Sequence, residues 1–450
     1  MRCLFIYPSW NVWSGYSEGI GILSSLLKQA GHDVKLLYIN ENFFPFDEEK
    51  VKDYVEDYKP GIILFSVVTN QRWVTNRIAH SIRTYSSVPL VIGGIHPTSS
   101  PEKCLEDFDI VCRGEGEGAV VELVNALEGM KPISSINNLW LREEDRTIRN
   151  PLRPFVNLSS LPIGDRTVFD YQKILDIRAG WIDVMAGRGC PRACSYCFNQ
   201  SYAKLYQQDG HFGYIRMKSP QHIIAEIEDL RGKYKGVNTV TFIDDSLTLN
   251  ARWLESFCPQ YKREVGLPFT VQANPLELTK DVVQLLKDAG CLTIRIGVET
   301  ANHNTRRQIL NRPMSNRQMI DAIEQLKSAG IRVYTSNMIG LPGETKDDVL
   351  KTIKFNAELG VNIARFLTFY PFRGTPIYDL CIEQGLLDPT STDEVPGYIA
   401  GTILNHSDEF KDFIEDVQAR PCDYLNMFCQ EKNYKYKLSY AARFPEKVPK

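Results

Sequence analysis

The chain has 450 residues, a length that points to two or three domains rather than one hydrophobic core. It is 43% hydrophobic and 24% charged, as globular proteins are, and no apolar run approaches the roughly 20 residues that a membrane-spanning helix needs. A formal net charge of -3 gives no general electrostatic reason to bind nucleic acid.

The N-terminus enters a short β-type run directly, without the apolar core and cleavage site of a secretory signal. We therefore expect a cytoplasmic protein with no transmembrane segment. In that compartment its 11 cysteines are expected to be thiols, buried or metal-bound, rather than disulfides.

Residues 1–132 alternate short apolar runs with helical segments. Ile20, Leu23 and Leu27, for example, recur at helical spacing between the first two runs. Apolar strands separated by helices predict an α/β fold, a doubly wound, Rossmann-like parallel sheet of five strands that binds ligands at the carboxyl ends of its strands. The expected strands are 3–8, 34–39, 61–68, 89–94 and 109–114.

The rest of the chain divides into three further segments. Residues 133–180 are expected to form a linker with an exposed hairpin at 137–150, and residues 386–450 a small α-rich C-terminal segment. Residues 181–385 contain six strand–helix units, which predict a partial (β/α)6 barrel of TIM type with its reactive groups at the strand ends. The expected strands are 181–187, 238–245, 269–274, 293–300, 332–340 and 362–371.

Three cysteines, Cys190, Cys194 and Cys197, lie close together after the first barrel strand, in "GRGCPRACSYCFNQ". Cysteine thiolates hold iron–sulfur clusters, and a four-iron cube usually takes four of them, so three leave one iron open. The alternatives are a zinc site or three unrelated buried thiols. Zinc normally needs four ligands, and no second cysteine pair of the usual spacing exists. The spacing therefore favours a 4Fe-4S cluster with an open iron.

The C-x-x-x-C-x-aromatic-C pattern, with Tyr196 at the aromatic position, resembles the radical S-adenosylmethionine (SAM) superfamily. The resemblance implies that SAM chelates the open iron, with Tyr196 and Phe198 beside it. It also implies that an external reductant such as flavodoxin or ferredoxin reduces the cluster, which then splits SAM into a 5'-deoxyadenosyl radical. The cofactors supply that chemistry and the protein supplies orientation.

Two acidic positions in the barrel resemble SAM-binding residues of that superfamily. Asp244 and Asp245, in "FIDDSL", look like the site for the SAM ammonium group, although they could instead cap the following helix. Glu299, in "GVET", resembles the residue that binds the SAM ribose hydroxyls. By strand alternation it shares a face with Arg295, so a structural Glu–Arg pair is the alternative.

Later strand ends carry further residues of this kind. Met338, in "NMIGLPGET", resembles the fifth-strand segment that packs by the adenine, and Tyr370, in "FYPFRGTPIY", resembles the closing loop. Gln272 and Asn274 end the third strand, where they could contact SAM or substrate or could simply cap the barrel with polar groups.

The N-terminal sheet has no G-x-G-x-x-G motif at its first turn. Through "GGIHPTSSPE" and "VCRGEGE" it resembles instead the cobalamin-binding domain found in one class of radical SAM enzymes. Glycines at these strand ends would let the backbone approach a ligand, and hydroxyls would bind a nucleotide tail. The residues are Gly93, Gly94, Gly114, Gly116, Ser66 and Thr69. The alternative is a flavodoxin-like domain that binds nothing.

One motif of cobalamin proteins at large is absent. No D-x-H-x-x-G sequence supplies a histidine to cobalt, and His96, in "GIHPTS", does not match it. We expect His96 to be a turn residue rather than a metal ligand, since a lone histidine lacks the partners that a site requires. The lower axial ligand of cobalt therefore stays open.

Together these resemblances imply a cobalamin-dependent radical SAM methyltransferase that acts on an unactivated carbon of a small molecule or of a natural-product or lipid intermediate. The 5'-deoxyadenosyl radical would take hydrogen from the substrate, which would then collect a methyl group from methylcobalamin. We expect the substrate to lie between the strand ends of the two domains. The alternatives are an oxidative cyclase or rearrangement enzyme without methyl transfer, and a non-catalytic corrinoid carrier or sensor.

Overall fold

The structure is a computed structural model and describes residues 1–10, 12–143, 146–390, 401–429 and 436. These residues form two compact units. The first contains Met1–Ile177 and Ser201–Tyr214, and the second contains Arg178–Gln200 and all of the described residues from Ile215 onward. Within the described residues, no helix is long and apolar enough to cross a membrane.

The first unit is built on a seven-stranded sheet with the order β2-β1-β3-β4-β5-β6-β7. Its first five strands are parallel, which confirms the predicted doubly wound sheet. They are β1 (Arg2–Pro8), β2 (Asp33–Ile39), β3 (Ile62–Ser66), β4 (Leu90–Gly93) and β5 (Ile110–Cys112).

The predicted hairpin forms the other two strands, β6 (Leu139–Glu143) and β7 (Arg146–Arg149). Strand β6 pairs antiparallel with β5, and its Leu139, Trp140 and Leu141 are buried. The expectation of an exposed hairpin therefore holds for β7 alone. Burying the apolar side chains of β6 stabilises the fold more than leaving them exposed to solvent would, and β6 also covers the edge of the parallel sheet.

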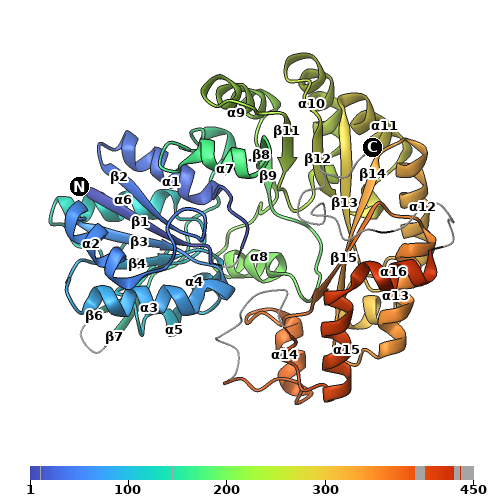
Figure 1. The fold of residues 1–450 in the computed structure, drawn as a ribbon. Helices are drawn as coiled ribbons and strands as arrows, with labels where there is room; N and C mark the ends of the chain where they lie inside the picture. Colours follow the sequence, from blue (N-terminus) through green and yellow to red (C-terminus); the bar gives the residue numbers. More distant parts are fainter. Residues whose placement is uncertain (11, 144–145, 391–400, 430–435, 437–450) are drawn as a thin grey trace. The chain divides into compact units, whose positions relative to one another are not determined.

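Helices cover both faces of this sheet (Figure 1). Helices α1 (Glu18–Gln29) and α6 (Glu117–Glu128) contact each other, and so do α2 (Glu48–Tyr58) and α3 (Arg72–Arg83). The apolar stripes of α2 and α3 share one core with the strands. Shorter elements lie at the strand ends: η1 (Thr69–Gln71), α4 (Ile95–Ser99) and α5 (Pro101–Cys104).

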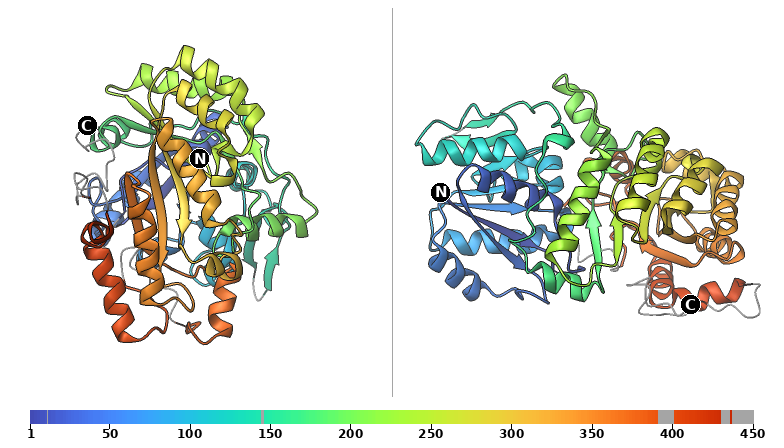
Figure 2. Two further views of the ribbon diagram at one scale, coloured as in Figure 1. Left: turned by 90° about the vertical axis from the view of Figure 1, so that its right-hand side faces the viewer. Right: turned by 90° about the horizontal axis from the view of Figure 1, so that it is seen from above.

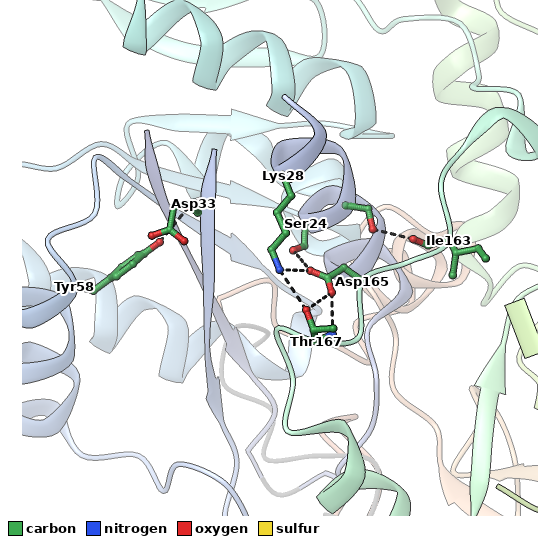
Figure 3. A network of polar contacts seen from close by, with 8 residues as sticks. Ser24, Lys28, Asp33, Tyr58, Ile163, Asp165 and Thr167 are labelled. Carbon is green, nitrogen blue, oxygen red and sulfur yellow. Dashed lines mark hydrogen bonds and ion pairs between the residues drawn. The ribbon is translucent and has the colours of Figure 1, made fainter. Parts of the chain in front are cut away.

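A hydrogen bond and an ion pair hold the irregular connection after the hairpin against α1 (Figure 3). Ser24 Oγ donates to Asp165 Oδ2 at 2.7 Å, and Lys28 Nζ lies 2.7 Å from the same oxygen. Burial opposes ionisation of this carboxyl, but hydrogen bonds from Lys28, Thr167 and Ser24 lower the pKa of Asp165. The connection continues through η2 (Leu158–Ser160) and α7 (Tyr171–Ile177).

The second unit is an open sheet of six parallel strands with the order β15-β14-β13-β12-β11-β8, which confirms the predicted partial barrel. Its helices lie along the outside of the curved sheet (Figure 2). The strands are β8 (Trp181–Val184), β11 (Thr239–Phe242), β12 (Phe269–Ala273), β13 (Cys291–Glu299), β14 (Arg332–Ile339) and β15 (Ile363–Thr368). The helices are α9 (Pro220–Lys233), α10 (Ala251–Glu264), α11 (Lys280–Ala289), α12 (Asn316–Ser328) and α13 (Lys346–Glu358).

Short elements complete this unit. Strands β9 (Gly187–Arg188) and β10 (Arg216–Met217) pair antiparallel. Helix α8 (Phe198–Gln208) follows the cysteine motif, and from Ser201 onward it belongs to the first unit. The chain continues with η3 (Leu247–Leu249), η4 (Pro275–Glu277), a π-helical turn η5 (Thr305–Ile309) and α14 (Pro376–Glu383). Of the predicted α-rich C-terminal segment, α15 (Asp408–Ala419) and α16 (Pro421–Phe428) are described, and residues 391–400, 430–435 and 437–450 lie outside the described residues.

Candidate active site

The cysteine loop, defined here as residues 189–197, lies between β9 and α8, after the carboxyl end of β8. Burial raises the pKa of the Cys190 thiol and raises that of Cys197 to about 11. The charges of Asp245 and Cys194 also contribute to both shifts. These groups therefore lie within electrostatic reach of one another.

The donors around the thiols suit a four-iron cluster. The backbone N–H of Arg192 donates to Cys190, and that of Asn199, in the first turn of α8, donates to Cys197. Such donors favour the thiolate that binds metal. In the described part of the chain, no three His, Cys, Asp or Glu side chains gather closely enough to hold a single metal ion. In a 4Fe-4S cluster each cysteine binds a separate iron, so the cysteines lie farther apart than the ligands of a single metal ion. The positions of these side chains therefore give no support to the zinc alternative.

The segment after β13 holds the loop in place. Ser195 N donates to Leu310 O at 3.0 Å, and Ser195 Oγ donates to Ile309 O at 2.5 Å. Asn311 Nδ2 donates to Ala193 O at 2.7 Å. These three hydrogen bonds hold residues 193–195 of the loop against the turn after β13.

A second group of contacts holds the first half of the loop. Arg192 Nη2 donates to Glu277 Oε1 at 3.0 Å. The other oxygen of Glu277 accepts from Ser246 Oγ at 2.5 Å and from Thr248 Oγ1 at 2.7 Å. One carboxylate thus joins the turns after β11 and β12 to the loop.

Tyr196 and Glu299 meet across the barrel interior. Tyr196 Oη donates to Glu299 Oε1 at 2.9 Å, and Arg312 Nη1 lies 3.7 Å from the same oxygen. Burial raises the pKa of Glu299, while the charge of Arg312 and the hydrogen bond from Tyr196 oppose that rise. The expected alternative of a Glu299–Arg295 pair is wrong, because Arg312 is the basic partner, and Arg295 lies over the ring of Tyr334 at 5.6 Å instead.

A backbone irregularity explains why simple strand alternation failed here. The register between β13 and β14 shifts between Gly297 and Glu299, and Glu299 has a φ of 65°. A side chain in that left-handed region is uncommon and is maintained only where surrounding contacts favour it. The distortion directs the Glu299 carboxylate toward Tyr196 and Arg312.

The two aspartates of "FIDDSL" differ in their surroundings. Asp244 is buried, and its two carboxylate oxygens accept from the backbone N–H groups of Ala186 and Gly187, at 3.1 and 2.5 Å. It therefore ties the end of β11 to the segment that precedes the cysteine loop. Asp245 is exposed and interacts electrostatically with two of the thiols. Neither aspartate caps α10, whose N-cap is Asn250.

The remaining predicted SAM-site residues lie at strand ends or beside the loop. Tyr196 and Met338 pack against the same hydrophobic cluster, which includes Leu310. Phe198 is the first residue of α8, and Tyr370 follows β15, with its ring 5.0 Å from that of Phe372. Gln272 is exposed, whereas Asn274 accepts from Leu276 N and so caps η4.

In the first unit, the predicted cobalamin residues lie at the carboxyl ends of β3 and β4. Ser66 and Gly93 are register partners there, and Thr69 Oγ1 lies 3.3 Å from His96 Nδ1. His96 is buried, in the first turn of α4. A Cβ at Gly94 would lie 2.7 Å from Val67 O, so this glycine permits a close backbone approach within the protein.

The glycines after β5 have two different environments. A Cβ at Gly114 would lie 2.4 Å from the hydroxyl of Tyr206, whereas one at Gly116 would meet only ordinary contacts from 3.4 Å outward. The backbone N–H of Glu115 donates to the same hydroxyl at 2.8 Å. Tyr206 therefore shapes this turn.

Sequence reasoning missed Arg192, Glu277, Arg312 and Tyr206. Arg192 lies inside the cysteine motif and could have been noticed there. The other three have no motif or periodicity of their own, because their roles come from partners far away in the chain.

Comparisons with known proteins identify two domains in the chain. Residues 184–355 match the radical SAM superfamily, and residues 15–124 match the B12 binding domain. A protein of Pyrococcus horikoshii named as an uncharacterized methyltransferase is 27% identical over 381 residues, which cover 83% of this chain and 80% of that protein. The anaerobic magnesium-protoporphyrin IX monomethyl ester cyclase of Rubrivivax gelatinosus is 23% identical over 404 residues, with coverages of 86% and 70%.

A solved structure shares the fold. The radical S-adenosylmethionine methyltransferase TsrM of Kitasatospora setae, with cobalamin and a 4Fe-4S cluster bound, matches with a TM-score of 0.71 at 17% identity, over 90% of this chain and 80% of that one. A B12-binding sheet and a radical SAM barrel in one chain define a cobalamin-binding enzyme of radical chemistry. Residues 184–355 are therefore a radical SAM domain and residues 15–124 a B12-binding domain, and the enzyme has a 4Fe-4S cluster, SAM and cobalamin as its cofactors. These matches favour an enzyme over a non-catalytic carrier or sensor.

Proposed function

We propose that this enzyme is a methyltransferase that transfers a methyl group from SAM to an unactivated carbon of a small molecule or of a natural-product or lipid intermediate. The observation that carries the proposal is the cysteine loop, whose Cys190 and Cys197 thiols lie within electrostatic reach of Asp245, in a chain that also contains a B12-binding domain. The relative named as a methyltransferase supports it across most of both chains.

The residues around the loop have the following proposed roles. Cys190, Cys194 and Cys197 ligate the cluster, Asp245 accepts from the SAM ammonium group, and Glu299 accepts from the ribose hydroxyls. When bound, the reduced cluster supplies the electron that splits SAM, and cobalamin carries the methyl group. Asp244, with both oxygens occupied by backbone donors, keeps the start of the loop in place.

The first unit is proposed to hold cobalamin at its strand ends. Ser66 and Thr69 offer hydroxyl groups, and Gly93 and Gly116 carry no side chain that would keep a ligand from the backbone there, whereas the space beside Gly114 is taken by Tyr206. An external one-electron donor such as flavodoxin or ferredoxin is the proposed source of electrons. The proposed substrate is a small molecule, and the proposed electron donor is a protein.

A second candidate is a cyclase or rearrangement enzyme that uses the same cofactors without methyl transfer. The relative named as an anaerobic cyclase, similar over most of this chain, favours it. The two candidates share every proposed contact around the cysteine loop and differ only in the fate of the SAM methyl group.

Methyl-labelled SAM tests the proposal without a known substrate. The anaerobically reconstituted enzyme, with cobalamin and a low-potential reductant, should place the label on protein-bound cobalamin and should also release 5'-deoxyadenosine. Deoxyadenosine without labelled cobalamin would favour the second candidate. A Cys194→Ala variant is the control, because it should release no deoxyadenosine.

A further inference from the structure

Arg312 links three groups that the proposed chemistry uses. Its Nη1 donates to Tyr196 Oη at 3.1 Å and to Cys194 Sγ at 3.7 Å, and it lies 3.7 Å from Glu299 Oε1. Its Nη2 donates to Gly297 O at 2.8 Å. The guanidinium therefore bridges the cysteine loop and the distorted end of β13.

The surroundings keep this positive charge away from water. The side chains of Arg312 and Glu299 are 11% and 10% exposed. In such a setting, solvent screens charges weakly, and a hydrogen bond to a charged atom is stronger than one at the surface. A guanidinium is always charged in proteins, so its effect on neighbouring groups does not depend on pH.

The backbone that carries Arg312 is itself held rigidly. Arg306 is fully buried, and its guanidinium donates to Thr300 O at 2.5 Å, to Met314 O at 3.1 Å and to the side-chain oxygen of Asn316. Arg312 N donates to Arg306 O at 2.7 Å. The turn after β13 therefore presents Arg312 to the loop with little freedom.

We propose that Arg312 is a positioning residue that raises the reduction potential of the cluster by donating to the Cys194 sulfur while it aligns Tyr196 and Glu299. Reduction adds one electron from an external donor to the cluster. Hydrogen bonds to the sulfurs and nearby positive charge both favour the more negative, reduced form. The inference rests on the proposed ligation of the cluster by the three cysteines.

Arg192 provides a matched control. Arg192 lies in the cysteine loop itself and, like Arg312, pairs with a carboxylate, in this case Glu277. Its side chain is 35% exposed, and none of the side-chain hydrogen bonds described for it reaches a cysteine sulfur. Arg192→Gln thus removes one positive charge near the cysteines, as Arg312→Gln does, without removing a side-chain donor to sulfur.

The test uses the full chain with its cluster reconstituted anaerobically, without SAM. The protein is equilibrated at a series of solution potentials, and EPR of the reduced cluster gives the ratio of reduced to oxidised protein. Arg312→Gln should lower this ratio about tenfold at a given potential, which is about 59 mV for a one-electron couple. Arg192→Gln should change it by less than about threefold, as expected from loss of a partly exposed ion pair.

Two further variants separate the effect of charge from loosening of the loop. Arg312→Lys should keep the ratio close to the wild-type value, because the charge remains. Glu299→Gln, which removes the opposing charge and leaves Arg312 in place, should not lower the ratio. If Arg312→Gln fails to bind iron, Glu299→Gln still tests the inference. A lower ratio of reduced to oxidised protein in Glu299→Gln would mean that any disturbance of these side chains lowers the reduction potential.

The inference is overturned if Arg312→Gln holds its cluster and matches Arg192→Gln in the measured ratio, or if Arg312→Lys falls as far as Arg312→Gln. Iron and sulfide content distinguishes this failure from failure of the proposed function. Wild-type protein that takes up no iron would contradict the cluster assignment, whereas loaded protein with an unchanged ratio would contradict only the role of Arg312.

Discussion

Tyr196 and Glu299 lie 103 positions apart in the sequence and are joined by a 2.9 Å hydrogen bond from the phenol to the carboxylate. Both groups are largely removed from solvent, and the bond connects the cysteine loop to the end of the fourth barrel strand. A buried carboxylate that loses a donor retains its full desolvation penalty. This bond therefore stabilises the barrel as well as the site.

The substitution Tyr196→Phe tests that relationship. Removing the hydroxyl leaves Glu299 with Arg312 as its remaining charged partner, and we expect the free energy of unfolding to fall by about 1–3 kcal/mol. Tyr424→Phe is the control, because Tyr424 donates to Asp416, a carboxylate that is 35% exposed. Its loss should be about 1 kcal/mol or less. Urea unfolding of both variants measures the difference, and equal losses would contradict the argument.

The cysteine assignment predicts a selective loss of iron. Replacing Cys190, Cys194 or Cys197 with Ala should abolish the broad visible absorption and most of the bound iron after anaerobic reconstitution, because each proposed ligand holds a different iron. Cys258→Ala, a buried thiol in α10, should keep both. Iron and sulfide assays check the result, and full iron content in the three loop variants would defeat the assignment.

Local patterns predicted the two sheets well. The apolar runs at 181–187 and 269–274, for example, correspond to β8 and β12. Strands of a parallel sheet are buried on both faces, so their residues must be mainly apolar. The motif with three cysteines likewise lies in one short loop and could be recognised without any tertiary contact.

The contacts between loop and barrel could not be predicted in this way. Arg312 and Tyr196 are 116 positions apart, and Arg192 and Glu277 are 85 apart, so no short motif contains either pair. The bulge at Glu299 also broke the strand alternation on which the Arg295 alternative depended. Such pairings are set by the packing of whole strands and turns.

Glu344 predicts a pH-dependent stability. This carboxyl follows β14, and one of its oxygens accepts from Gly340 N at 2.7 Å and from Leu341 N at 3.1 Å, while the other is buried without a hydrogen-bond partner among the described residues. Burial raises its pKa from 4.5 to about 8. The unfolded carboxyl ionises first, so this group's contribution to stability is present at low pH and is lost as pH rises toward 8.

Glu344→Gln should remove that dependence. An amide oxygen can accept both N–H groups, and the uncharged side chain has no ionisation cost, so the variant should differ little from wild type at pH 5. At pH 8 it should be more stable by a few kcal/mol, since each unit of pKa shift corresponds to about 1.4 kcal/mol. Unfolding measured across this range gives the slope. A constant difference between the two proteins from pH 5 to 8 would contradict the prediction.

Adjacent glycines at the end of β4 offer a last, sharply matched comparison. The sequence predicted one role for both, but a Cβ at Gly93 would lie 3.7 Å from its nearest neighbours, whereas one at Gly94 would lie 2.7 Å from Val67 O. Gly94 also has φ 110° and ψ -167°, a region open essentially to glycine alone.

Gly94→Ala should therefore destabilise the first unit by at least about 1–3 kcal/mol and weaken cobalamin binding, because the turn after β4 must move. Gly93→Ala should lower stability by about 1 kcal/mol or less, since the added methyl group would make only ordinary van der Waals contacts, from 3.7 Å outward. Thermal unfolding together with cobalamin titration of both variants measures the two effects. If Gly93→Ala lost as much stability as Gly94→Ala, the close approach to Val67 would not be the reason for a glycine at this turn.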